Sequence, residues 1–359
     1  MKLYSDEIAA LLRAVLWNEP LTIDVSLLMQ RELWNQLYRQ QMAHMVALWA
    51  LNNHIPILQS AQQKINIAIT LQRREHQNAL LVELVSLLRK HHIEPILIKG
   101  YAIALLYPNP DVRDFADVDL YIGEEDYDRM IPIIRDAYPQ AHWFSEEHGG
   151  LHFTMVLDEN NDRIAELHRV TMELTHMPRA NKAYQRFTLC EMAKTRTIIV
   201  NNVSVSIPSK AYNSLYIFMH AWHHFASSGV GLRQLADWAL ALHDAVSEYE
   251  LAQILEPVLK QMHMLEIWQT FGWVLVNKLG LPKNEFPLYN NLSDRKGEQL
   301  FSQLIQYGHG GRVYPYQRPT SGRLKQKLYT LRRLTIQHAQ LAKLFPKFAI
   351  CEYVSVLFL

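Results

Sequence analysis

"DVRDFADVDLYIG", residues 111–123, is the segment that decides the fold. Charged side chains crowd its first half, whereas the second half is apolar and ends at a glycine, which is typical of a buried strand. Asp117 and Asp119 stand at alternate positions, so in a strand both carboxylates point to the same face, with Cα atoms about 7 Å apart. Two like charges on one face repel each other. The pattern therefore predicts a positive group between them.

The neighbouring segments predict a small mixed sheet around this strand. "PILIKG" (95–100) is a short apolar run that ends at glycine, as a buried strand does. Two helices are predicted by "YAIALLYP" (101–108) and by the acid-capped "EEDYDRMIPIIRDAY" (124–138). "LHFTMVLDENNDRIAELHRV" (151–170) predicts two strands around an Asn-Asn turn, and "TIIVNNVSVSIP" (197–208) predicts a hairpin with Asn201 and Asn202 at its tip.

Helical periodicity dominates on both sides of this sheet. Apolar residues recur every three or four positions in "SDEIAALLRAVL" (5–16) and in "NALLVELVSLLRKHH" (78–92), and helical periods return from Ser209 onward. We therefore predict an α+β protein in three parts. These are an N-terminal helical region (1–90), a small mixed sheet (91–208) and a C-terminal helical region (209–359).

Composition restricts the classes of partner. The 359 residues are 49% hydrophobic and 20% charged, as in ordinary globular proteins, and the net charge of +1 gives no general attraction for nucleic acid. The cysteines, Cys190 and Cys351, fit no metal or redox spacing. The acidic residues near the N-terminus do not fit a signal peptide, so a reducing, cytoplasmic setting is expected.

No stretch reaches the ~20 consecutive apolar residues of a transmembrane helix. The apolar ending "CEYVSVLFL" (351–359) is expected to dock on the core or on a partner, with contact to a membrane surface as the alternative.

Glu166, in "RIAELHRV" (163–170), is the third candidate acid. We expect its strand to lie antiparallel and adjacent to that of Asp117 and Asp119, with Glu166 and His168 on one face. Three such acids without a metal would raise one another's pKa values. Two divalent ions, Mg²⁺ or Mn²⁺, about 3.5–4 Å apart would neutralise them and assist a phosphoryl displacement. The alternative for any Asp-x-Asp pair is a solvated strand edge.

Three segments together carry a resemblance to a known family. They are "ILIKGYAIALLYPNPDVRDFADVDLYI" (96–122), "AELHRV" (165–170) and "FMHAWHHFASSGVGLRQLADWALAL" (218–242). In order and spacing they resemble the nucleotidyltransferases of the DNA polymerase beta-like superfamily. Within that superfamily the chain looks most like a bacterial family known only as uncharacterised nucleotidyltransferases. The resemblance covers roughly residues 85–245.

The resemblance implies a nucleotidyltransferase palm and a Mg²⁺-dependent transfer of a nucleoside monophosphate from an NTP to an unknown acceptor, a small molecule or a protein. It assigns the metals to Asp117, Asp119 and Glu166, although aspartate is commoner than glutamate at the third position. The nucleotide would be bound by residues 99–101 and by Arg113. Here the chain departs from the superfamily, because Lys99-Gly100-Tyr101 stands where Gly-Ser or Gly-Gly is usual.

The roles of the two cations have alternatives. Lys99 would place a point charge on a phosphate, or form an ion pair at the strand end. Arg113 would hold phosphates, or pair with Asp114 or Asp117. A further group is expected behind the metal site or on the acceptor side: His168, His220, His224, Arg233 and Asp237.

Simpler interpretations exist for the residues of the later helices. His220 and His224, four apart on a helix, have the spacing of a zinc pair, but no His-Glu-x-x-His motif accompanies them, so histidines that line a site or the core are expected. Arg233 and Asp237 fit a local ion pair.

Other functional classes fit less well. Only 15 residues separate Lys99 from Asp114, and no His-Arg-Asp loop lies between them, which excludes a protein kinase. No phosphate-loop motif occurs. No basic run with interleaved aromatics indicates nucleic-acid binding. The remaining rival is a catalytically inactive nucleotidyltransferase-like scaffold that binds nucleotide or protein.

Overall fold

The computed structural model describes residues 4–58, 61–145, 150–158, 162–174, 177–247, 250–291, 294–311 and 321–357. The chain forms two units, each assembled from several segments. The sheet unit comprises His44–Glu173 and Thr188–Asn213, and the helical unit comprises Met1–Ala43, Leu174–Phe187 and Ser214–Leu359. The three-part division at residues 90 and 208 stays a prediction.

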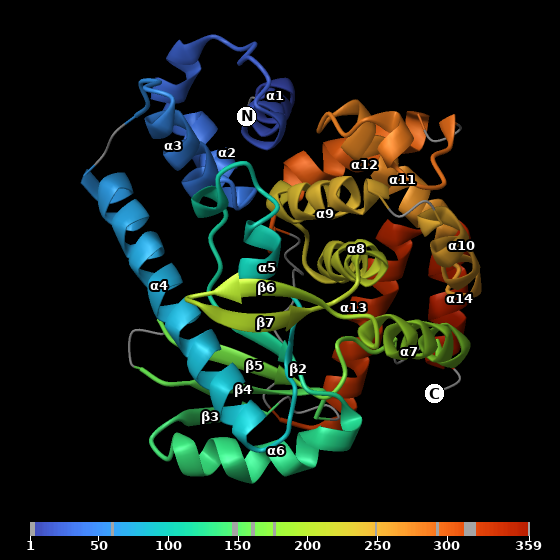
Figure 1. Cartoon of the computed structure of the whole chain (residues 1–359). Helices are drawn as coiled ribbons and strands as arrows, with labels where there is room; N and C mark the ends of the chain where they lie inside the picture. The colour runs from blue at the N-terminus through green and yellow to red at the C-terminus, as the bar shows by residue number, and fades with distance from the viewer. Residues whose placement is uncertain are drawn as a thin grey trace. The chain divides into compact units, whose positions relative to one another are not determined.

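The sheet unit contains a seven-stranded mixed sheet with the order β3-β4-β5-β2-β1-β7-β6 (Figure 1). The predicted fold class, a mixed sheet flanked by helices, is therefore confirmed. The strands are β1 (Ile96–Leu97), β2 (Val118–Tyr121), β3 (His142–Ser145), β4 (His152–Val156), β5 (Ile164–His168), β6 (Arg196–Val200) and β7 (Val203–Ile207).

The predicted direction of the Glu166 strand is wrong, because β5 runs parallel to β2. The cause is the connection: after β2 the chain passes through α6 (Glu124–Ala137) and the antiparallel β3–β4 pair, and β4 then turns antiparallel into β5. Parallel neighbours require such a crossover. Asp119 and Glu166 are nevertheless direct partners in the ladder, so both side chains point to the same face of the sheet.

Turn chemistry explains the hairpin at the far edge. Asn201 and Asn202 have φ values of 46° and 64°, the left-handed conformation that a two-residue turn requires and that asparagine tolerates. The predicted β6–β7 hairpin is confirmed. By contrast, β3 was not predicted, because its four residues show no alternation and Phe144 is exposed at the opposite edge. The predicted turn at Asn160 and Asn161 lies outside the described residues.

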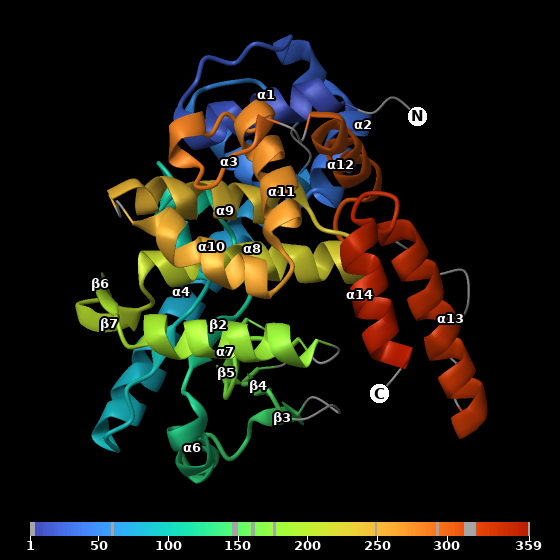
Figure 2. The same cartoon turned by 90° about the vertical axis from the view of Figure 1, so that its right-hand side faces the viewer.

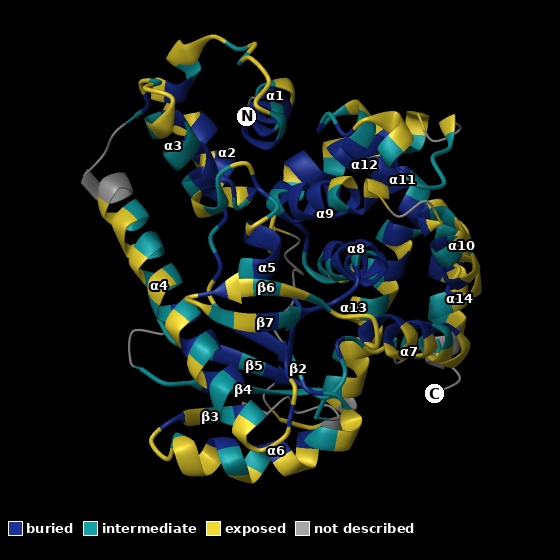
Figure 3. Cartoon of the chain, viewed as in Figure 1, coloured by how far each residue is buried: buried dark blue, intermediate teal, exposed yellow. Residues whose placement is uncertain are grey.

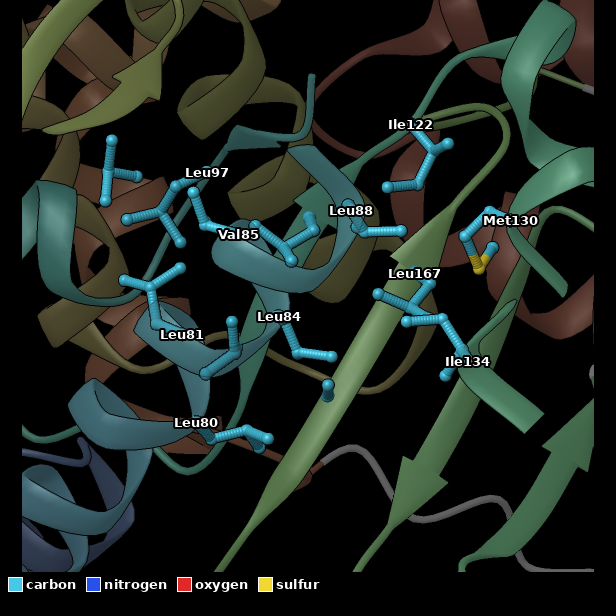
Figure 4. Close-up of a cluster of buried hydrophobic side chains, with 14 of the residues drawn as sticks. Leu80, Leu81, Leu84, Val85, Leu88, Leu97, Ile122, Met130, Ile134 and Leu167 are labelled. Atoms are coloured by element: carbon cyan, nitrogen blue, oxygen red, sulfur yellow. The ribbon is translucent and has the colours of Figure 1, made fainter. Parts of the chain in front are cut away.

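One face of the sheet is buried by helices. Leu80, Leu84 and Leu88 recur every four residues along α4 (Ala61–Lys90) and join α6 residues in one cluster with Leu120 and Leu167 (Figure 4). Burial of each such leucine contributes roughly 1.5–3 kcal/mol. Strand side chains alternate between faces. The register that sends Leu120 and Leu167 into this cluster therefore sends their neighbours Asp119 and Glu166 to the other face. Figure 3 shows how deeply β2 and β5 are buried.

Short elements surround the strands of the sheet unit. They are α3 (Ala43–Asn52), α5 (Tyr101–Ala104) and η2 (Pro110–Val112), and α7 (Pro178–Met192) begins in the helical unit and ends in the sheet unit. The expected helix after Gly100 is therefore present as a single turn.

The helical unit is organised around aromatic rings. Trp238, Trp268 and Phe271 are fully buried, and Phe218 contacts all three. Its helices, several of them visible in Figure 2, are α1 (Ser5–Trp17), η1 (Val25–Met29), α2 (Arg31–Arg39), α9 (Leu232–Asp244), η3 (Ala245–Ser247), α10 (Leu251–Gln261), α11 (Leu265–Asn277), η4 (Lys283–Glu285), α12 (Asp294–Tyr307), α13 (Arg323–Leu341) and α14 (Pro346–Leu357), together with most of α8 (Lys210–Ser227), which begins in the sheet unit. Within the described ranges no helix has the length and apolar character needed to cross a bilayer.

The apolar ending of the chain belongs to α14. Glu352 pairs with His338 Nε2 of α13 at 3.2 Å, and the Tyr353 hydroxyl lies 3.0 Å from Thr335 Oγ1. This part of the segment packs on α13, while the side chains of residues 355–359 lie outside the described set.

Candidate metal and nucleotide site

The site begins where β1 ends. The Ile98 amide donates to the Asp119 carbonyl at 3.1 Å, which extends the β1–β2 pairing up to Lys99. Gly100 then adopts φ 60° and ψ −118° as the N-cap of α5. Only glycine populates this backbone region at low cost. A Cβ atom here would lie 3.4 Å from the Asp117 carbonyl oxygen, so Gly100 turns the chain tightly past the acidic segment.

Replacement of Gly100 by alanine is expected to destabilise the protein by about 1–2 kcal/mol, because the new side chain must adopt a strained φ beside the Asp117 carbonyl. Chemical denaturation measures this loss. Gly310→Ala is the control. Gly310 also has a positive φ, but no atom lies within 4 Å of an added Cβ, so the stability loss at Gly100 should exceed the loss at Gly310. A Gly100→Ala protein as stable as the wild type would contradict the strain.

Asp119 is the centre of the site. Its side chain is 1% exposed, and its Oδ1 accepts hydrogen bonds from Lys99 Nζ at 2.8 Å and His168 Nε2 at 3.1 Å. Burial pushes the pKa of this carboxyl upward, but the Lys99 ammonium and His168 outweigh it and hold the pKa far below its usual range. Lys99 thus forms the strand-end ion pair that was the alternative to a phosphate contact.

Glu166 and His168 complete a set of three possible cation ligands. Together with Asp119 they offer ligand atoms that all lie within 4.8 Å of one another. His168 Nε2 is 3.5 Å from Glu166 Oε2. Two carboxylates and one imidazole form a donor set suited to a divalent ion such as Mn²⁺ or Mg²⁺. The structure therefore brings together two of the three predicted metal ligands, with His168 in a closer position than the sequence indicated.

His168 is held tightly between the acids. Its ring is 4% exposed and lies 4.9 Å, centroid to centroid, from that of His152 on β4. Burial disfavours the imidazolium, but hydrogen bonds to Asp119 and Glu166 outweigh burial and raise the pKa of His168. Among the described residues, no hydrogen-bond partner reaches its buried Nδ1. In the metal-free protein His168 is therefore a hydrogen-bond donor to the acids, and its Nε2 can bind a cation only in the neutral form of the ring.

Asp117 precedes β2 and is half-buried. It is not a member of the set of three ligands, yet it shares their electrostatic field. Repulsion by Asp119, followed by burial, raises the pKa of Asp117 to about 7, and Glu166 adds to this rise while Lys99 and Arg113 oppose it. Its role as a metal ligand stays a prediction.

The predicted nucleotide-binding residues differ in their surroundings. Arg113 is 7% exposed and donates from Nη1 to the Asp114 carbonyl at 3.0 Å. Tyr101 opens α5, and its ring lies edge-on to that of Phe115. Lys99 and Gly100 adjoin the acids, as described above. The roles of these residues toward a nucleotide stay predictions.

Arg74 is a cation at this site that the sequence did not reveal. Its guanidinium lies 5.3 Å from the Tyr101 ring centroid and 5.7 Å from that of Phe115, and it pairs with Asp111 at 3.5 Å. Burial lowers the pKa of Arg74, and Asp111 partly restores it. Arg74 belongs to a polar stretch of α4 without any motif, so no sequence signal pointed to it. It holds the α5 turn against the segment that precedes β2.

Four predicted residues belong to the helical unit and not to the sheet unit. His220 and His224 are neighbours on α8, with ring centroids 4.6 Å apart. Arg233 and Asp237 form the expected i, i+4 ion pair on α9, at 3.9 Å. Neither histidine occurs in the group of possible metal ligands found among the described residues. An acceptor-side role for these four residues stays a prediction.

Comparison with known proteins identifies one family. A family model described as "Uncharacterised nucleotidyltransferase" matches residues 31–273, well over half of the chain. No curated protein matches. Among solved structures, the chain is similar to an antigenic nucleotidyltransferase-like protein from Paracoccidioides brasiliensis, with 15% identity over 62% of this chain and 97% of that chain and a TM-score of 0.37.

Proposed function

Since the chain belongs to the uncharacterised nucleotidyltransferase family, we propose that it transfers a nucleoside monophosphate from an NTP to a hydroxyl or phosphate group of an acceptor, with pyrophosphate as the leaving group. The acceptor is a small molecule or a protein. The observation that carries the proposal is the convergence of Asp119, Glu166 and His168 on one sheet face, beside the Gly100 turn.

The residues present fit a divalent cation. Asp119 and Glu166 would hold it, and neutral His168 would supply a nitrogen ligand, since one ligand atom of each of the three residues lies within 4.8 Å of the others. When bound, Mg²⁺ or Mn²⁺ supplies positive charge that offsets the negative charge of the triphosphate and of the departing pyrophosphate. Asp117 is the candidate for a further ligand, because its carboxyl shares the field of the same acids.

The remaining residues would bind the nucleotide and move the proton. The turn at Gly100 has no side chain, so the nucleotide triphosphate can approach the backbone closely. Lys99 and Arg113 would orient the phosphates. The acceptor oxygen attacks the α-phosphorus, the bond from that phosphorus to the pyrophosphate oxygen breaks, and the acceptor proton passes to the Glu166 carboxylate. The Glu166 side chain is 25% exposed, so an acceptor can reach it.

One observation favours a second candidate, a protein that binds nucleotide without turnover. The 2.8 Å contact between Lys99 Nζ and Asp119 Oδ1 gives the buried carboxylate a counter-ion from the chain itself. Such compensation stabilises Asp119 without any metal. A divalent ion that uses Asp119 has to compete with this ammonium or displace it.

Transfer of label distinguishes the two candidates. The purified protein is incubated with each α-³²P-labelled NTP, Mg²⁺ or Mn²⁺, and a cell extract. We expect label to move onto a small molecule or a polypeptide and to be abolished by EDTA. Nucleotide binding in equilibrium dialysis without any transferred label would support the second candidate. Transfer that persists fully in EDTA would refute the metal-dependent reaction.

A further inference from the structure

The last two helices expose apolar side chains to solvent. On α13 Leu328 and Leu331 are 58% and 42% exposed, and on α14 Ile350 and Val354 are 61% and 44% exposed. Residues three or four apart share one side of a helix, so each pair forms a continuous apolar strip. Figure 2 shows α13 and α14 lying side by side. Single exposed leucines need no explanation, but paired strips on adjacent helices indicate a surface that binds something.

Cations surround these strips. Lys325 stands three residues before Leu328, and Lys327 stands four residues before Leu331, so both ammonium groups lie next to the leucines on the same helix. On α14, Lys347 stands three residues before Ile350 in the same manner. All three lysines are exposed. The α13–α14 surface, defined by Lys325, Lys327, Leu328, Leu331, Ile350 and Val354, thus combines aliphatic groups with positive charge.

The surrounding sequence concentrates this charge. Residues 321–357 contain seven lysines and arginines and a single acid, Glu352, whereas the whole chain has a net charge of +1. That acid is already paired with His338 Nε2 at 3.2 Å. Helix α13 itself contains no acidic residue. The rest of the chain is therefore net negative, whereas this region has a net positive charge.

We propose that the α13–α14 surface binds anionic phospholipid membranes. Lysines next to aliphatic side chains match both parts of such a membrane, because the ammonium groups meet the headgroup phosphates while the leucines enter the boundary with the acyl chains. A symmetric contact with a second copy of this chain would bring two positively charged surfaces together and is disfavoured. Nucleic acid would use exposed aromatic rings for stacking, whereas Tyr329 and Tyr353 of these helices are half-buried. The surface is independent of the proposed reaction.

Vesicle flotation with the full-length protein tests this proposal. Vesicles contain either phosphatidylcholine alone or phosphatidylcholine and phosphatidylserine in equal parts. We expect the protein to float with the anionic vesicles at low salt, to dissociate as salt rises, and to float poorly with phosphatidylcholine alone. Absence of flotation, or equal flotation with both compositions, would overturn the proposal.

Paired variants separate the two components of the surface. Lys325→Gln with Lys327→Gln is expected to weaken binding about 30-fold, and Leu328→Gln with Leu331→Gln by roughly tenfold or more. The controls are Leu189→Gln, a leucine of α7 that is 66% exposed, and the exposed pair Lys90→Gln with Lys260→Gln, which remove equivalent groups elsewhere. RNA binding of the same variants is measured in parallel. The lipid assignment would be wrong if the leucine variant bound vesicles like the wild type. It would also be wrong if the lysine variant lost RNA binding but kept its vesicle binding.

Discussion

Replacement of Asp119 by asparagine is expected to abolish nucleotidyl transfer, with a loss of at least about 10³-fold, while the protein remains folded. The carboxylate is the common partner of Lys99 and His168 and a member of the cation ligand set. A neutral amide retains the shape of the side chain but cannot balance these charges or hold a divalent ion. The measurement is label transfer from the preferred NTP, with circular dichroism to confirm folding.

The same substitution should cost about 1–3 kcal/mol of stability, because two cationic groups lose their buried counter-ion. Lys99 is 16% exposed, so water partly compensates. Asp136→Asn, at an exposed carboxylate of α6, is the matched control and should retain full activity. Normal turnover by the Asp119→Asn protein would remove this residue from the chemistry, whatever its effect on stability.

Local patterns were sufficient for the elements near the site. The apolar run that ends at Gly123 predicted β2, and the glycine after "LIK" predicted the end of β1. The direction of β5 was not predictable in the same way. A five-residue strand reads identically in parallel and antiparallel pairs, and the choice depends on the crossover through α6 and the β3–β4 pair. Alternation alone places Asp119 and Glu166 on alternate positions of their strands in either case, whereas their direct pairing depends on the register of β2 and β5.

The cations at the site were harder to predict than the acids. Lys99 could be placed beside either a phosphate or a carboxylate from sequence, and its 2.8 Å contact with Asp119 appears only when β1 and β2 are adjacent. Arg74 carries no motif and reaches Tyr101 and Phe115 from a position more than twenty residues earlier in the sequence. His168 was placed behind the metal site, yet its Nε2 contacts both acids. These contacts depend on tertiary packing, which no local pattern encodes.

In the absence of divalent metal, the stability of the protein is expected to fall as the pH rises from about 4 to about 7. The pKa of Asp117 is raised to about 7 in the folded state, mainly by Asp119, and is about 3.9 in an unfolded chain. In this window the folded state binds a proton that the unfolded state lacks, so the free energy of unfolding decreases with pH. The loss from this carboxyl should be on the order of 2–4 kcal/mol.

Asp117→Asn isolates the contribution of this carboxyl. The amide cannot ionise, so urea denaturation in EDTA should give a much flatter profile between pH 5 and pH 8, and the variant should be more stable than the wild type at the alkaline end. A smaller decline should persist, because the pKa of His168 is also raised on folding and its stabilisation is likewise lost as the pH rises through the folded value. Asp136→Asn should keep the wild-type profile. If Asp117→Asn instead declined as steeply as the wild type, repulsion between Asp117 and Asp119 could not be the cause of the pH dependence.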